Sequence, residues 1–165
     1  MSEVLQGAAA RATEPVHPLE VRVTAPARLH LGFLDLEGGL GRRFGSLGLT
    51  IEGFATRLRL TRAAATTVTG ASDLDRARDL LATLSVKLDL PPLAVAIEET
   101  IPAHAGLGSG TQLGLALGMG AARLMGLEAR PRDVARLLER GARSGIGIGA
   151  FEEGGFILDG GRGRA

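Results

Sequence analysis

Hydrophobic and polar residues alternate along the first third of the chain, which is the pattern of half-buried β-strands. The alternation runs over 19–24, is interrupted at Pro26 and resumes over 28–36. It returns over 47–51 and again over 54–62. The sequence therefore predicts four strands, connected by turns, before any helix begins.

The period then changes from two to between three and four, which predicts helices. Apolar residues at three- and four-residue steps predict an amphipathic helix over 73–88, with Ser72 expected to cap it. A strand is predicted over 93–97, a second helix over 111–125, and a third helix that begins at Pro131.

The two ends of the chain carry less pattern. Residues 1–18 contain two prolines and no sustained periodicity, so we expect a flexible leader followed by one domain over 19–165. The glycine-rich stretch 144–161 is expected to form a short strand pair. Strands, one helix, a strand, two helices and final strands predict an α+β fold, with a mixed or antiparallel sheet and helices packed on one face.

Composition removes several classes of function. Nineteen basic residues stand against 18 acidic ones, so a net charge of +1 supplies no global field for nucleic acid or an anionic membrane. The chain has no Cys, Trp or Tyr, which excludes disulfides, thiolate chemistry and an aromatic platform for bases. No apolar stretch is long enough to span a bilayer. We therefore expect a cytoplasmic protein with no nucleic-acid partner and no membrane partner.

The segment PAHAGLGSGTQ, residues 102–112, joins the predicted strand to the second helix. Glycines let backbone N–H groups converge, and a helix N-terminus adds partial positive charge, so this turn suits a phosphate or pyrophosphate. A tight turn that only caps the helix is the plainer alternative. The predicted phosphate-binding residues are Gly106, Leu107, Gly108, Ser109, Gly110 and Thr111, with the two hydroxyls available to an anion or to Mg²⁺.

Two common phosphate loops do not fit this segment. A Walker A loop needs lysine before its hydroxyl residue, and Gly110 occupies that place. A dinucleotide fingerprint on the same glycines should follow its strand at once, whereas residues 100–105 intervene.

The loop does resemble that of the GHMP superfamily, which includes galactokinase, homoserine kinase, mevalonate kinase and phosphomevalonate kinase. Ala25-Pro-Ala-Arg28 with Gly32 is similar to the N-terminal motif of that superfamily, and Gly154-Gly155 to a later glycine pair. The resemblance implies a ribosomal protein S5 domain 2-like fold for this N-terminal domain. It also implies a second, C-terminal GHMP domain, for which we find no counterpart in this sequence.

Two departures separate the chain from the kinases. Residues 144–147 read Ser-Gly-Ile-Gly where those kinases usually carry Ser-Gly-x-Asp, so Gly147 replaces the catalytic aspartate. Gly110 replaces the second serine of the kinase loop. A kinase that must activate a hydroxyl would lack its usual carboxylate.

A narrower family has both features. The segments RLHLGFLDL, GRRFGSLGL, GLGSGTQL and SGIGIGAFE, in this order, resemble β-ribofuranosylaminobenzene 5′-phosphate synthase over about 19–161. This resemblance implies condensation of phosphoribosyl pyrophosphate with 4-aminobenzoate, with release of CO₂ and pyrophosphate, in tetrahydromethanopterin biosynthesis. It also implies Mg²⁺, which would neutralise the leaving diphosphate.

Further residues are candidates for the chemistry. Arg42 is expected to be catalytic, and Arg28 and Arg43 to contact phosphate, because arginines beside glycines can form bidentate contacts. Asp35 is expected to be catalytic, by holding Mg²⁺ or the ribose hydroxyls, and Ser109 is the other expected metal ligand. A turn-capping role is the alternative for Asp35. His30 could carry a proton or contact the aromatic substrate, and packing is an equal alternative.

Two other readings stay open beside the decarboxylating phosphoribosyltransferase. One is a GHMP-type small-molecule kinase that binds ATP and phosphorylates a hydroxyl. The other is an inactive half-domain that binds phosphates or pairs with another chain. Small-molecule substrates are the expected partners, and a homodimer is left open.

Overall fold

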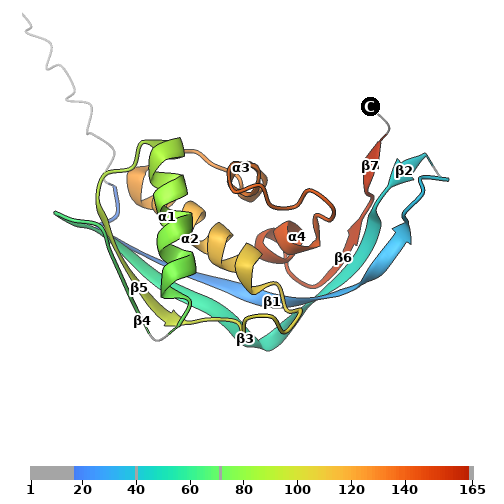
Figure 1. Ribbon diagram of the computed structural model, residues 1–165, viewed down its shortest axis with the longest axis horizontal. Coiled ribbons are helices and arrows are strands. Elements are labelled where there is room, and N and C mark those ends of the chain that lie inside the picture. Colours follow the sequence, from blue (N-terminus) through green and yellow to red (C-terminus); the bar gives the residue numbers. More distant parts are fainter. Residues whose placement is uncertain (1–16, 40, 71, 164–165) are drawn as a thin grey trace, which may run out of the picture.

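The computed structural model describes residues 17–39, 41–70 and 72–163. Figure 1 shows one twisted sheet with the helices gathered on one side of it. In chain order the elements are β1 (Glu20–Asp35), β2 (Arg42–Arg43), β3 (Gly45–Arg62), β4 (Thr67–Gly70), α1 (Leu74–Leu88), β5 (Leu93–Glu99), α2 (Ser109–Met125), α3 (Pro131–Leu137), α4 (Ile146–Glu152), β6 (Phe156–Asp159) and β7 (Arg162–Gly163).

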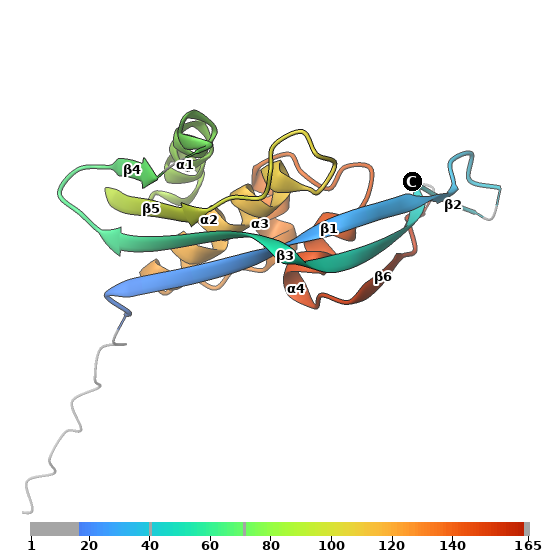
Figure 2. The same ribbon diagram turned by 90° about the horizontal axis from the view of Figure 1, so that it is seen from below.

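The main sheet has the strand order β1-β3-β5-β4. Its pairs are antiparallel except β4 with β5, which run parallel. The long β3 has two partners on its second edge: β5 pairs with Arg57–Arg62, and β6 pairs with Ser46–Leu49. Figure 2 shows the result, an arm of β1, β3 and β6 that extends beyond β4 and β5. The predicted α+β class and mixed sheet are confirmed.

The first four predicted strands are in fact two long ones. Pro26 interrupts the alternation but not the strand, because it lies on the edge strand β1, where a missing N–H is tolerated. The register shifts between Pro26 and Ala27, whose partners on β3 are Ala55 and Ile51. Gly53, with φ +88°, lies in the extra segment of β3. The apparent breaks in the sequence are therefore a bulge.

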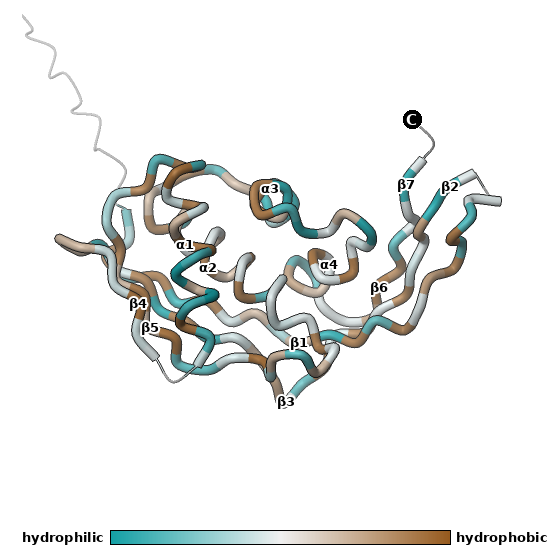
Figure 3. The backbone as a smooth tube through the Cα atoms, viewed as in Figure 1, coloured by the Kyte–Doolittle hydropathy of each residue, from teal (hydrophilic) through white to brown (hydrophobic). Residues whose placement is uncertain are grey.

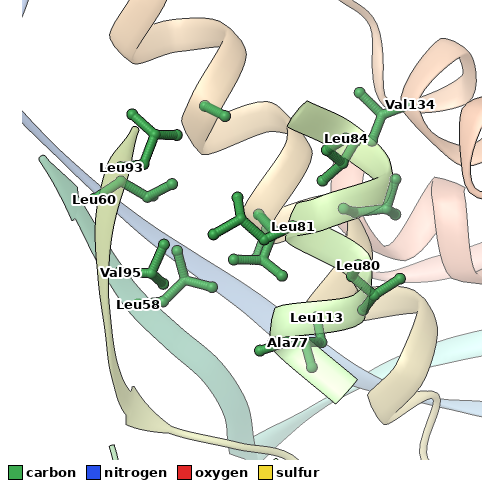
Figure 4. Close-up of a cluster of buried hydrophobic side chains, with 14 of the residues drawn as sticks. Leu58, Leu60, Ala77, Leu80, Leu81, Leu84, Leu93, Val95, Leu113 and Val134 are labelled. Carbon is green, nitrogen blue, oxygen red and sulfur yellow. The ribbon is translucent and has the colours of Figure 1, made fainter. Parts of the chain in front are cut away.

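The hydrophobic core lies between the sheet and the helices. Figure 4 shows Leu58, Leu60 and Val95 of the sheet facing Leu81 and Leu84 of α1, and all five side chains are buried. Both long predicted helices form, and helices cover one face of the sheet as expected. No helix among the described residues is long and apolar enough to cross a membrane.

The central helix α2 approaches its neighbours closely because it carries glycines where they touch it. A Cβ added at Gly118 would lie within 2.3 Å of a methyl of Val134 on α3. A Cβ at Gly120 would lie 2.4 Å from a methyl of Leu60 on β3. The small residues therefore set the distance between α2, the sheet and α3.

The outer face of the arm is apolar and exposed. Figure 3 shows hydrophobic residues continuing along β1 and β6 beyond the helices. Leu29, Leu49 and Phe156 lie opposite one another on β1, β3 and β6, and all three are exposed. Their neighbour Gly48 faces the other way, toward Ile146 of α4. Helix α4 thus covers only one face of the arm.

Three local expectations are wrong or untested. Ser72 does not cap α1: its hydroxyl bonds that of Thr100 at 2.7 Å, and the N-cap residue is Asp73 in the left-handed conformation. The stretch 144–161 is not a strand pair but contains α4, followed by β6, which pairs with β3. Most of the expected leader, residues 1–16, lies outside the described residues.

We expect Gly120→Ala to lower the free energy of unfolding by about 1–3 kcal/mol, because the new methyl overlaps Leu60 in the packed core. Helix propensity alone would favour alanine by about 1 kcal/mol. The matched control is Gly110→Ala in the same helix, whose Cβ would meet only Arg76 at 3.8 Å. Urea unfolding measures both, and equal stability of the two variants would contradict the close packing.

Candidate functional site

The loop between β5 and α2 has the backbone geometry of an anion cradle. Gly106 and Gly108 adopt φ +76° and +86°, which side-chain-bearing residues rarely do. Gly108 is the N-cap of α2, and no side chain caps that helix. Its first turn contains no acidic residue. The positive end of a 17-residue helix is therefore open to an anion at this loop.

Arg28 ties the loop to the sheet. Its Nη1 donates to the carbonyl oxygen of Gly106 at 2.8 Å, and its backbone N–H donates to that of Leu107 at 3.1 Å. The Nε atom is buried and has no partner among the described residues. Burial lowers the pKa of the guanidinium, but an arginine keeps its proton at any physiological pH. A positive charge with one unused donor thus lies under the loop.

A cavity of about 310 Å³ opens in front of the loop. Arg28 reaches it from β1, Arg76 from α1, and Arg140 from the segment that follows α3. Within the part of the chain that the structure describes, no carboxylate lines the cavity. Arg76 has an ion pair with Asp73 at 3.7 Å, whereas the side chain of Arg140 has no partner among the described residues. The cavity therefore favours a polyvalent anion.

The predicted loop residues Gly106, Gly108, Ser109, Gly110 and Thr111 line this cavity, and Leu107 contributes the carbonyl oxygen that Arg28 binds. Sequence analysis missed Arg76 and Arg140. Both belong to elements remote in sequence from the loop, and a chain in which 18 of the 19 basic residues are arginine gives no sign of which ones converge.

Gly147, which stands where the resemblance to the kinases places an aspartate, takes part in a different contact. Nε2 of Gln112, a fully buried side chain, donates to the carbonyl oxygen of Gly147 at 2.7 Å. A Cβ on Gly147 would lie 3.0 Å from a methyl of Thr111. The start of α4 is thus packed against the start of α2, with no carboxylate between the two.

Asp35, Arg42 and Arg43 lie elsewhere, at the far end of the arm. Oδ1 of Asp35 accepts the N–H groups of Gly38 and Gly39 at 2.7 and 3.2 Å, which is the turn-capping alternative. The seven residues of extended chain from Arg28 to Asp35 span about 23 Å. None of the three lines the glycine-loop cavity.

The side chains of Arg42 and Arg43 have structural contacts at this end. Arg42 donates from Nε and Nη2 to the carbonyl oxygens of Gly160 and Gly161, at 2.6 and 2.7 Å. The side chain of Arg43 packs against Gly38. These contacts join β2 to the C-terminal strands, and the predicted substrate contacts of both arginines stay predictions.

The structure does not bring Asp35 and Ser109 together: Asp35 ends β1, whereas Ser109 begins α2 and lines the glycine-loop cavity beside Arg28. The geometry does not favour joint ligation of Mg²⁺ by the two residues, which stays a prediction, because nearness in sequence to Arg28 is not nearness in space along a strand. Among residues 17–39, 41–70 and 72–163 no group of three acidic or histidine side chains could hold a metal ion. The hydroxyls of Ser109 and Thr111 remain, and an ion there would depend on substrate phosphates.

His30 is half-buried and does not line the cavity. Its Nε2 is buried without a partner among the described residues. Its ring lies 4.7 Å from that of Phe33, centroid to centroid. The structure favours the packing alternative for His30, and a role in proton transfer stays a prediction.

The family of the chain follows from a direct match. The GHMP kinases N terminal domain family matches residues 64–155, more than half of the chain, and the chain belongs to that family. Solved structures agree on the fold. Streptococcus pneumoniae phosphomevalonate kinase superposes with a TM-score of 0.65 at 16% identity, covering 86% of this chain and 48% of that one. Leishmania major mevalonate kinase gives a TM-score of 0.63 at 17% identity, covering 92% and 53%.

More similar relatives carry a different description. A β-ribofuranosylphenol 5′-phosphate synthase of Methanocaldococcus jannaschii is 35% identical over 152 residues, covering 84% of this chain and 46% of the relative. A protein of the same name from Archaeoglobus fulgidus is 33% identical over 142 residues, covering 86% and 45%. The chain thus spans about half the length of the curated relatives it matches.

We expect Gly108→Ala to weaken binding of inorganic pyrophosphate about tenfold or more, measured by calorimetric titration. The new Cβ would lie 2.9 Å from Cζ of Arg28 and displace the guanidinium. Gly106→Ala is the matched control, since it suffers the same backbone strain but meets nothing within 4 Å. Equal affinity losses in the two variants would show that Arg28 is not part of the anion site.

Proposed function

We propose that the chain binds the diphosphate of phosphoribosyl pyrophosphate at the glycine loop, as part of a synthase that joins it to 4-aminobenzoate. The observation that carries this proposal is the cavity itself, which combines an uncapped helix N-terminus, three guanidiniums and no carboxylate. The names of the relatives, which describe a ribofuranosyl phosphate product on an aromatic ring, support the substrate class.

The proposed reaction breaks two bonds and forms one. The C1–O bond of the ribose breaks, and its electron pair leaves with pyrophosphate. The ring carbon that bears the carboxylate attacks C1, and the new carbon–carbon bond forms. The bond to the carboxylate then breaks, CO₂ leaves, and the released electron pair restores the aromatic ring.

None of these reaction steps requires a base to remove a proton from a hydroxyl. The protein must stabilise the charge that develops on the leaving diphosphate, which guanidiniums and a helix N-terminus do. Gly147, where the related kinases usually carry aspartate, fits a reaction without a general base. We propose that Mg²⁺ enters together with the diphosphate and that the Ser109 hydroxyl would help to hold it. The ion would supply further positive charge beside the leaving group.

A GHMP-type kinase is the second candidate, and the fold favours it. ATP would occupy the same glycine loop, and the chemistry would then need a carboxylate near the acceptor hydroxyl. Residue 147, which the resemblance aligns with the kinase aspartate, is glycine, and its carbonyl oxygen accepts a hydrogen bond from Gln112. An inactive half-domain is the third candidate, and it would bind phosphates without forming product.

We expect phosphoribosyl pyrophosphate with Mg²⁺ to bind at least tenfold more tightly than ribose 5-phosphate in calorimetric titration, because only the former carries the diphosphate. Arg28→Gln should remove that difference, and Arg123→Gln on the exposed side of α2 should preserve it. Equal affinity of the wild-type chain for the two sugars would overturn the proposal.

Activity is tested on the chain and on a chimera in which it replaces the matching part of the Methanocaldococcus jannaschii relative. Both substrates and Mg²⁺ should give ribosylaminobenzene phosphate, detected by mass, in the chimera. A chimera that binds phosphoribosyl pyrophosphate but forms no product would favour the inactive half-domain.

The kinase hypothesis predicts ADP formation that depends on an alcohol substrate. We expect no ADP above the ATPase background when the chain or the chimera is mixed with ATP, Mg²⁺ and galactose, homoserine or mevalonate. ADP formation that depends on one of these alcohols would establish the kinase instead.

A further inference from the structure

A second cavity, of about 430 Å³, lies between α3, α4 and the strands β6 and β7. It is larger than the glycine-loop cavity, and its volume is ordinary for a small-molecule site. Arg140 lines both cavities. Figure 1 shows α3 and β7 on either side of α4 in this region. Two ligands bound in the two cavities would therefore meet at Arg140.

Three guanidiniums of the second cavity are not neutralised by an ion pair. The side chains of Arg132 and Arg140 have no hydrogen-bond or ion-pair partner among the described residues, and Arg162 donates only to the carbonyl oxygen of Gly141. Arg136 differs, since it lies 3.6 Å from Asp133. The cavity therefore has positive charge available to a bound anion.

Carboxylates line the same cavity, which limits the kind of anion. Asp159 is occupied: Oδ2 accepts the N–H of Gly145 at 2.6 Å, and Oδ1 that of Gly161 at 3.0 Å. The side chains of Glu152 and Glu153 accept no hydrogen bond among the described residues, and Glu152 is near enough to Arg130 for their charges to interact. The residues that line the cavity carry four guanidiniums and three carboxylates, so a singly charged acid with a donor group fits this mixed lining better than a doubly charged phosphate.

The charges are ordered along α4. Arg140 and Thr111 both line the glycine-loop cavity, and Thr111 packs on Gly147 in the first turn of α4. Arg140 is therefore on the side of the second cavity near the start of α4. Glu152 and Glu153 lie at the other end, about 10 Å away along a seven-residue helix. Ile148 lies between the two ends and lines the cavity. This spacing suits a benzoate with a donor group in the para position.

We propose that this cavity binds the aromatic carboxylate acceptor, with its carboxylate toward Arg140 and its para amine or hydroxyl toward Glu152 and Glu153. This inference rests on the proposed function and locates its second substrate. The reacting ring carbon, which bears the carboxylate, then faces the glycine-loop cavity and C1 of the ribose.

The glutamates would also contribute to the reaction. Attack by the ring on C1 leaves positive charge on the ring, and a para amine or hydroxyl carries most of it. A carboxylate within hydrogen-bond reach of that group stabilises the charge as it develops. The phenol named in the relatives carries a hydroxyl and an aniline carries an amine, and either group can donate to a carboxylate.

The test is methyl NMR on isoleucine-labelled chain, in which Ile148 and Ile157 line the cavity and Ile97 lies in the core as reference. We expect 4-aminobenzoate to shift Ile148 and Ile157 but not Ile97. The double variant E152Q/E153Q should weaken 4-aminobenzoate about tenfold and leave benzoate unchanged, because only the amine uses the glutamates.

Arg140→Gln should weaken both aromatic acids, and the matched control Arg123→Gln neither. Shifts of Ile148 by ribose 5-phosphate that compete with 4-aminobenzoate would overturn the inference and make the cavity a sugar-phosphate site. The inference would also be overturned if E152Q/E153Q lowered the affinity for benzoate as much as the affinity for 4-aminobenzoate. An absence of 4-aminobenzoate shifts would do the same.

A separate measurement tests the proposed function. Inorganic pyrophosphate should shift the backbone amides of Ser109 and Gly110 whatever happens at Ile148. Pyrophosphate that leaves those amides unmoved would contradict the glycine-loop site, whereas moved amides without aromatic shifts would place the acceptor outside this cavity and leave the proposed function intact.

Discussion

The close packing of α2 against everything around it is the constraint on which the rest of the structure depends. Residues 112–124 of this helix are buried except Met119 and Arg123, and its glycines set how near the sheet, α1 and α3 can come. A helix fixed along its length has a fixed N-terminus. Because that end carries the open N–H groups, the core packing determines where an anion can bind and which arginines surround it.

Periodicity was sufficient for the regular part of the fold and insufficient where glycine and proline interrupt it. The apolar steps of α1 lie on the one face that it buries, whereas α2 is buried on nearly all sides, and both helices form where they are predicted. Pro26 and Gly53 looked like strand ends, yet both lie at a bulge in continuous strands. Glycines hid α4, whose helical state depends on packing against Thr111 and Ile157 rather than on propensity.

The candidate site was predictable to the extent that it is local in sequence. The loop residues 106–111 and Arg28 were found because a glycine-rich turn before a helix has a direct physical meaning. Arg76 and Arg140 reach the cavity only through tertiary structure. Asp35 lies away from Ser109 for the converse reason: an extended strand separates residues by about 3.3 Å each, so seven positions along β1 place Asp35 far from the loop that Arg28 contacts.

The two cavities together explain how a kinase-like fold could serve a different chemistry. A kinase acceptor must lose a proton, which needs a carboxylate beside the glycine loop. In the proposed transfer the acceptor loses CO₂ instead, and the groups required are cations at the leaving diphosphate and anions near the electron-donating substituent of the ring. The arginines around the loop and the glutamates at the end of α4 occur in that order, with Arg140 between them. A glycine at residue 147, in place of a side chain that could take up a proton, is consistent with the same proposed arrangement.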